Sequence, residues 1–157
     1  GSWTPAKLKM AVSGCPRNCA EATCKDIGVV CVDSGYEIHF AGAAGLDIKG
    51  TEVLGLVKTE DEVMEYVMAL AQMYREQGHY LERIYKWANR IGYDEVRRQI
   101  MDDSEKREGY YARFQASQKV AQVDPWAERA VHGVDAGEFE PLAVISPLAE
   151  PRLEAVV

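Results

Sequence analysis

The chain has 157 residues, of which 47% are hydrophobic and 27% charged, a composition typical of globular rather than disordered proteins. Its formal net charge of −7 argues against a nucleic-acid-binding protein, which needs a basic surface to neutralise phosphates. No apolar run is long enough to span a membrane and no secretory leader is recognisable, so we expect a cytoplasmic protein with no membrane or nucleic-acid partner.

The first third of the chain is predicted to form short strands joined by turns. Residues 6–13 alternate apolar and polar side chains, which is typical of a half-buried strand. Pro16 suits the first turn of a helix, so residues 16–24 are expected to form one or two helical turns. Further extended segments are predicted at 28–33, 36–42 (paired as a hairpin with 28–33), 46–48 and 52–57, with a small-residue loop at 42–45.

Helices are predicted to follow these strands. Thr59 and Glu62 have the spacing of a capping box, at the start of a helix that ends at Gly78. Three more helices are predicted, at 80–91, from Asp94 onward, and at 102–121. Strands followed by helices indicate an α+β fold, with a small antiparallel or mixed sheet followed by a run of helices.

The last part of the chain has a different character, and we divide the protein into a domain at 1–123 and an extended tail or arm at 124–157. The tail is rich in proline and shows no helical period towards its end. A disordered tail and an arm lying on a groove or a partner chain are both open, because the segment is too apolar for typical disorder. The candidate anchors of such an arm are Phe139, Leu142, Val144 and Ile145.

The cysteines are the main chemical signal, because all four lie within residues 15–31. Without a leader, metal or redox use is favoured over disulfides. At the start of the predicted helix, Cys15 and Cys19 would present both thiols on one side, where the helix dipole favours thiolate. An iron–sulfur cube ordinarily takes four cysteines, so two ligands would have to come from elsewhere. Cys31 is expected to be buried and inert in a strand, and Cys24 lies off the shared helical face.

The residues around this pair allow two interpretations. Arg17 and Asn18 are ordinary turn residues, or Arg17 offsets the charge of a cofactor and Asn18 donates a hydrogen bond to cluster sulfur. His39 is interpreted as a packed or solvent-edge histidine, and Lys25 and Asp26 as charges in a loop.

The segments "KLKMAVSGCPRNCAEAT" (7–23) and "GYEIHFAGAAG" (35–45), followed by a helix rich in Tyr and Glu, resemble a known family. They are similar to the C-terminal part of the siroheme-dependent nitrite and sulfite reductases, and within that family to the large subunit of the assimilatory NAD(P)H-dependent nitrite reductase. The resemblance implies a [4Fe–4S] cluster held by an upstream C-x5-C pair and by the C-x3-C pair that matches Cys15 and Cys19. It also implies that Cys19 bridges the cluster to the siroheme iron, and that Gly42 and Gly45 lie close to the siroheme.

The chain departs from the family pattern, because it contains no C-x5-C pair and no G-x-G-x-x-G motif for FAD or NAD(P)H. We therefore expect an inactive fragment that holds neither cofactor alone and carries no assigned catalytic residue. Its expected partner is the upstream part of the same polypeptide, with a small subunit or self-association as further candidates.

The function implied for the parent enzyme is reduction of nitrite to ammonia, with electrons from NAD(P)H passing through flavin and the cluster. One alternative is a sulfite reductase that produces sulfide. The other is a non-catalytic α+β module that completes a partner's iron–sulfur site.

Overall fold

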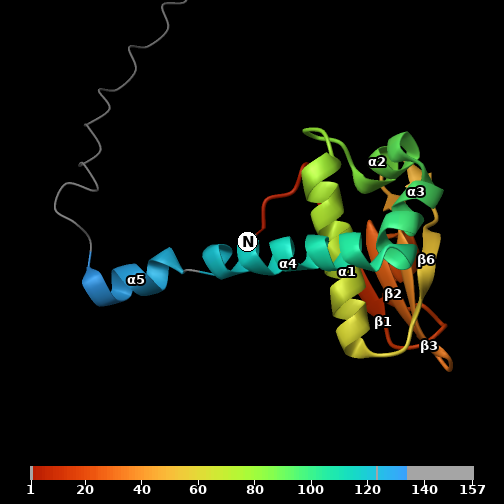
Figure 1. The fold of residues 1–157 in the computed structure, drawn as a ribbon, viewed down its shortest axis with the longest axis horizontal. Coiled ribbons are helices and arrows are strands. Elements are labelled where there is room, and N and C mark those ends of the chain that lie inside the picture. The colour runs from red at the N-terminus through yellow and green to blue at the C-terminus, as the bar shows by residue number, and fades with distance from the viewer. Residues whose placement is uncertain (1, 123, 134–157) are drawn as a thin grey trace, which may run out of the picture. The chain divides into compact units, whose positions relative to one another are not determined.

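A four-stranded mixed sheet forms one layer of the protein, in the order β1-β2-β3-β6 (Figure 1). The computed structural model describes residues 2–122 and 124–133. β1 and β2 are parallel, whereas the β2–β3 and β3–β6 pairs are antiparallel. The strands are β1 (Met10–Ser13), β2 (Ile27–Val32), β3 (Gly35–Phe40) and β6 (Glu52–Val57), and a separate two-stranded ladder joins β4 (Ala43–Ala44) to β5 (Ile48–Lys49). The predicted hairpin is therefore confirmed. The first strand covers only Met10–Ser13 and is shorter than the strand predicted at 6–13.

Helices form the second layer, and α1 and α4 pack against each other (Figure 1). The helical elements of this layer are α1 (Glu60–Gln77), α2 (Ile84–Ile91), α3 (Tyr93–Arg97), the π-helical segment η2 (Arg98–Asp102) and α4 (Ser104–Ala121). A further helix, α5 (Pro125–His132), belongs to a separate unit of the chain. A mixed sheet followed by helices confirms the predicted α+β class.

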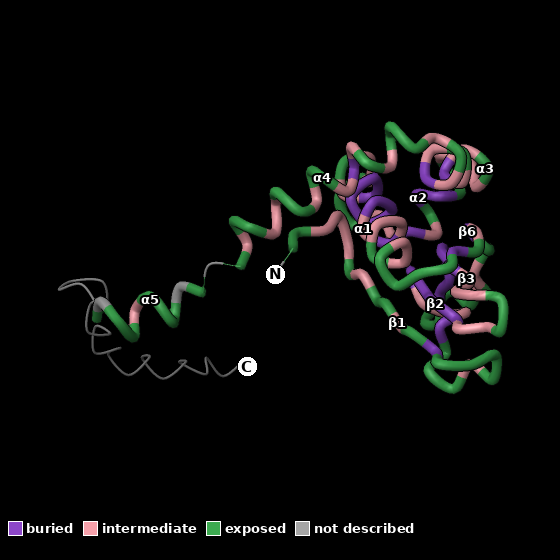
Figure 2. Tube along the Cα trace, turned by 60° about the horizontal axis from the view of Figure 1, so that its bottom comes forward, coloured by how far each residue is buried: buried purple, intermediate pink, exposed green. Residues whose placement is uncertain are grey.

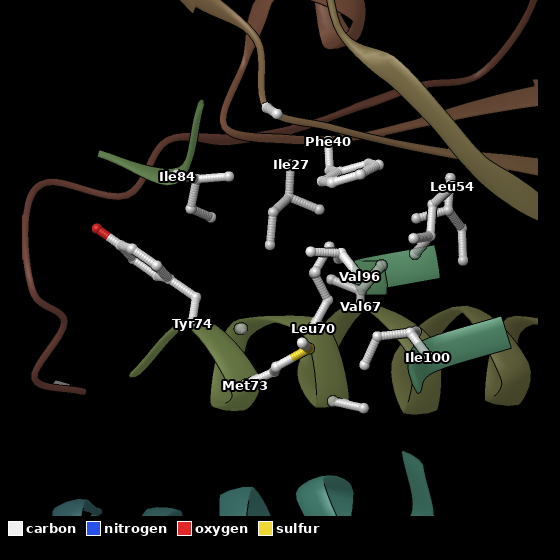
Figure 3. Packing of buried hydrophobic residues seen from close by; sticks show 14 of the residues in the cluster. Ile27, Phe40, Leu54, Val67, Leu70, Met73, Tyr74, Ile84, Val96 and Ile100 are labelled. Carbon is white, nitrogen blue, oxygen red and sulfur yellow. The ribbon is translucent and has the colours of Figure 1, made fainter. Parts of the chain in front are cut away.

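The hydrophobic core lies between one face of the sheet and α1 (Figures 2 and 3). Ile27 from β2, Phe40 from β3 and Leu54 from β6 face Leu70 of α1, and all four are at most 1% exposed. The rings of Tyr74 and Trp87 meet edge to face, with centroids 5.6 Å apart, and join α1 to α2. This core holds the sheet in place. The connection that carries the cysteines begins at the end of β1.

The connection between β1 and β2 covers the opposite face of the sheet. Ile27 and Val29 point into the core, so Gly28 between them faces away from it. A Cβ atom added to Gly28 would lie 2.1 Å from the carbonyl oxygen of Ala22, which begins the 3-10 helix η1 (Ala22–Cys24). Only glycine allows this approach, so η1 lies directly on β2.

The start of α1 is as predicted. Thr59 accepts a hydrogen bond from the backbone N–H of Glu62 and completes a capping box, and the helix ends at Gly78. The predicted helix at 80–91 is wrong in its first turn, because α2 begins at Ile84. Leu81 has a left-handed backbone (φ 64°), which interrupts a helix there and leaves Tyr80 exposed.

The chain divides into two compact units, residues 1–123 and 124–157. In the second unit the described residues form α5, which was not predicted; Asp124 caps it by accepting from the N–H of Trp126, and a proline opens it. The proposed anchors Phe139, Leu142, Val144 and Ile145 lie outside the described residues. Among the residues that the structure describes, no helix is long and apolar enough to cross a membrane.

Candidate metal centre

Cys15 and Cys19 lie in an exposed loop of turns, residues 14–21, which we call the cysteine loop. The N–H of Asn18 donates to the carbonyl of Cys15 (N···O 3.1 Å), and the N–H of Glu21 donates to the carbonyl of Asn18 (2.9 Å). Two consecutive turns therefore replace most of the helix predicted at 16–24. Within these residues only η1 is helical. Both thiols are exposed, so both are accessible to a ligand.

The predicted helix is wrong because two residues of the cysteine loop have left-handed backbone conformations. Asn18 has φ 53° and Glu21 has φ 55°, and neither value is compatible with a right-handed helix. Asparagine tolerates this conformation, and its side chain offers the backbone a hydrogen-bond partner that competes with helix formation. The two thiols are thus positioned by the turn between them, and not by one face of a helix.

The side chain of Asn18 connects the two ends of the cysteine loop. Its Oδ1 accepts from the hydroxyl of Ser13 (3.1 Å) and from the N–H of Ala22 (2.7 Å), and its Nδ2 donates to Oγ1 of Thr23 (2.6 Å). Ser13 is buried at the end of β1, and its hydroxyl also accepts from the N–H of Ala20 (3.3 Å). The carboxamide that one of the two interpretations assigned to cluster sulfur is therefore engaged within the loop itself.

The segment 42–51, which begins with the small-residue loop, is joined to residues 23–25 through backbone hydrogen bonds. The N–H of Gly42 donates to the carbonyl of Lys25 (3.0 Å), and the N–H of Thr51 donates to the carbonyl of Thr23 (3.0 Å). A Cβ atom on Gly42 would lie 2.6 Å from the oxygen of Lys25, so glycine is required there by packing. A Cβ atom on Gly45 would meet nothing within 4 Å, so the surface around it is open.

Residues 1–108 match the family described as "Nitrite and sulphite reductase 4Fe-4S domain". The chain belongs to this family. The resemblance inferred from the cysteine motif and the small-residue loop is thereby confirmed, and the chain is part of the group of nitrite and sulfite reductases.

Individual reductases of the family also match the chain. A nitrite reductase [NAD(P)H] of Bacillus subtilis is 44% identical over 125 residues, which cover 80% of this chain and 15% of that protein. The nitrite reductase (NADH) large subunit of Escherichia coli is 26% identical over 130 residues, covering 82% of this chain and 15% of the subunit. An assimilatory-type sulfite reductase of Nitratidesulfovibrio vulgaris is 27% identical over 97 residues, covering 62% of this chain and 44% of that protein. The chain thus spans about 15% of the length of these two nitrite reductases.

The donor set of this family member fits half of the cluster that the family description names. A [4Fe–4S] cluster ordinarily takes four thiolates, and Cys15 and Cys19 provide two exposed thiols. A Cβ atom on Gly14 would meet nothing within 4 Å, so the entry to the loop is uncrowded. Within residues 2–122 and 124–133, no group of three or more histidine, cysteine or acidic side chains could hold a metal ion.

The other two cysteines have different surroundings. Cys24 and Cys31 are both half-buried, and the Sγ of Cys24 donates to the carbonyl of Glu21 (3.2 Å). All four cysteines are free thiols. Cys31 is less buried than its apolar strand suggested.

Arg17 is exposed between the two thiols and makes no ion pair within the described part of the chain. Its guanidinium is therefore free to face an anionic group from outside the chain.

The sequence interpretation of Asp26 as a loop charge is wrong. Its carboxylate is fully buried, accepts two hydrogen bonds from Nη2 of Arg83 (2.7 and 2.8 Å) and one from Nε (3.2 Å), and accepts another from the N–H of Lys9 (2.7 Å). Arg83 stands 57 positions along the chain, so nothing in the local sequence signals the pair. Asp26 fixes the end of the β1–β2 connection against the start of α2.

His39 is the packed histidine that the sequence indicated. Its side chain is buried, with Nδ1 3.0 Å from Oγ1 of Thr51 and Nε2 3.4 Å from a carboxylate oxygen of Glu37. With one imidazole, one carboxylate and one hydroxyl, this group does not form a metal site.

Proposed function

We propose that this chain supplies two of the four cysteine ligands of a [4Fe–4S] cluster, through Cys15 and Cys19, within a longer siroheme-dependent reductase. The observation that carries the proposal is the pair of exposed free thiols on two consecutive turns, with Cys15 opening the first and Cys19 in the second. The family match supports the identity of the cluster, and the 15% coverage of the nitrite reductases supports a larger polypeptide.

The remaining two ligands are proposed to come from a C-x5-C pair elsewhere in that polypeptide. Cys24 is a poor substitute, because its thiol already donates to the backbone and it is only half exposed. Two thiolates alone hold an iron–sulfur cube poorly, so the isolated chain is expected to retain little iron. The alternative source of the missing ligands is a small subunit or a second copy of the chain.

For the reaction, we propose reduction of nitrite to ammonia with electrons from NAD(P)H that arrive through a flavin held elsewhere. The Bacillus subtilis relative named as a nitrite reductase supports nitrite, because it is 44% identical over 80% of this chain, compared with 27% over 62% for the relative named as a sulfite reductase. When bound, cluster and siroheme supply the one-electron transfers that such a reduction needs.

The chain's own residues would have three roles at this centre. Cys15 and Cys19 would hold the cluster iron as thiolates, and the family resemblance implies that Cys19 would also contact the siroheme. Arg17 offsets the negative charge that two thiolates and a cluster bring to an exposed surface. Gly45 leaves the adjoining loop open, so that a large cofactor could approach there, whereas Gly42 allows that loop to pack closely on Lys25.

The test is anaerobic reconstitution with iron and sulfide, followed by an iron and acid-labile sulfide count. We expect the chain mixed with the polypeptide segment that bears the C-x5-C pair to retain far more iron than either part alone. Replacing Cys15→Ser should abolish the gain, whereas the matched control Cys24→Ser should preserve it. Equal iron retention by the Cys15→Ser mixture would refute the ligand assignment.

Substrate is tested separately on the complete enzyme, by measuring ammonia formed from nitrite and sulfide formed from sulfite. Faster formation of ammonia is expected. A preference for sulfite would reverse the substrate assignment and leave the ligand assignment standing.

A further inference from the structure

We propose that Asn18 is a positioning residue, which fixes Cys15 and Cys19 relative to each other before any metal binds. The inference rests on the proposed function of the two cysteines and deepens it. It assigns to Asn18 a role within the protein, through the loop, in place of direct hydrogen bonding to cluster sulfur.

The contacts of Asn18 span the cysteine loop. The backbone N–H of Asn18 donates to the carbonyl of Cys15, and Asn18 directly precedes Cys19 in the chain. Its Oδ1 accepts from the hydroxyl of Ser13 on one side of the loop and from the N–H of Ala22 on the other (3.1 and 2.7 Å). One carboxamide therefore closes the segment that contains both thiols.

The groups that hold Asn18 are themselves fixed. Ser13 is the last residue of β1, is 2% exposed, and is paired in register with Val30 of β2. Ala22 is fully buried against Gly28, where no side-chain atom fits between them. Because Ser13 belongs to the sheet and Ala22 packs directly on β2, the carboxamide ties the cysteine loop to the sheet.

A second contact of Asn18 extends this attachment to Thr51, at the end of the segment 42–51. The Nδ2 of Asn18 donates to Oγ1 of Thr23 (2.6 Å), and the carbonyl of Thr23 accepts from the N–H of Thr51 (3.0 Å). Hydrogen bonds through Thr23 thus connect the cysteine loop to the segment 42–51, which contains β4 and β5. Such preorganisation reduces the conformational entropy that metal binding would otherwise cost.

Asparagine is suited to this position for two separable reasons. It tolerates the left-handed backbone (φ 53°), and it offers both an acceptor and a donor from one planar group. Asn18→Gly keeps the backbone conformation and removes the carboxamide. Asn18→Asp keeps the acceptor used by Ser13 and Ala22, and removes the donor to Thr23.

The experiment uses the full 157-residue chain in a Cys24→Ser, Cys31→Ala background, so that only the pair Cys15 and Cys19 reports. Zinc affinity is measured by competition with a chromophoric chelator, since Zn²⁺ readily takes cysteine thiolates. We expect Asn18→Gly to weaken zinc binding about 10- to 100-fold, the usual cost of losing a group that orients metal ligands. Asn18→Asp should restore part of that affinity, which a general loss of stability would not explain.

Urea unfolding of each variant accompanies the titration. If Asn18→Gly does not fold, Ser13→Ala replaces it, because it removes one hydrogen bond to Oδ1 and should weaken zinc binding about fivefold. Zinc affinity within twofold of the background chain, in whichever of these variants folds, overturns the role of Asn18.

A Cys15→Ser chain in the same background separates this inference from the proposed function. If Cys15→Ser loses zinc affinity and Asn18→Gly does not, only the positioning role fails. If Cys15→Ser binds zinc as tightly as the background chain, the cysteine pair is not the ligand set and both proposals fail.

Discussion

The buried ion pair of Asp26 and Arg83 gives the sharpest stability prediction. Asp26 is fully buried, whereas the side chain of Arg83 is 28% exposed. Replacing Arg83→Met leaves a buried carboxylate with one backbone donor, Lys9 N–H, and no counter-charge. Breaking a buried pair in this way costs about 3–5 kcal/mol of unfolding free energy.

Replacing the other partner of the ion pair, in Asp26→Asn, should lower the free energy of unfolding by less. In Asp26→Asn the guanidinium of Arg83 remains partly solvated, so the loss is that of unsatisfied hydrogen bonds, about 1–3 kcal/mol. The double variant Asp26→Asn/Arg83→Met should be more stable than the sum of the two losses implies, because the second change removes the group left unpaired by the first.

The assay is urea unfolding followed by far-UV circular dichroism, with Arg98→Met as the matched control. Arg98 forms an exposed ion pair with Glu95, at 50% and 39% side-chain exposure, and its removal should cost far less than that of Arg83, because water screens the pair. If Arg83→Met costs no more than Arg98→Met, or less than Asp26→Asn, the reasoning from burial is wrong.

Three further predictions concern the elements around the site. Gly28→Ala should destabilise the chain by about 1–3 kcal/mol in urea unfolding, because its methyl group would lie 2.1 Å from the Ala22 oxygen; an unchanged midpoint would contradict the packing of η1. Thr59→Ala should cost about 1 kcal/mol by removing the cap of α1, and Thr59→Ser should recover most of it. The hydrogen bond from Arg90 lowers the pKa of Glu82 from 4.5 to about 2, so this carboxylate stabilises the fold above pH 4.5 and loses that effect as the pH falls towards 2. Glu82→Gln should therefore show a smaller loss of stability than the wild type across that interval in acid unfolding, and an identical loss would contradict the assignment.

The sequence predicted those parts of the fold that local patterns determine. The capping box at Thr59 and the helix end at Gly78 follow from side chains and neighbours a few positions apart, and both are confirmed. The strand at 52–57 and the hairpin of β2 and β3 follow from apolar patterning and a turn, and are also confirmed.

The cysteine loop could not be predicted in this way, because side-chain hydrogen bonds that follow no periodic sequence pattern determine its conformation. Pro16 and the following residues are compatible with a helix, but the left-handed Asn18 is held by Ser13 and Thr23 on either side. The burial of Asp26 depends likewise on Arg83, far along the chain. The sequence identified the two candidate ligands, and the structure shows that a turn between them, and not a helix, sets their placement.

The most direct test of the ligand assignment is the iron content of the complete reductase carrying Cys19→Ser, beside the control Cys31→Ser. If Cys19 is a cluster ligand, iron and acid-labile sulfide should fall to a small fraction of the wild-type value in Cys19→Ser and remain unchanged in Cys31→Ser. Full iron and sulfide content in the Cys19→Ser enzyme would contradict the assignment of this loop as half of the cluster site.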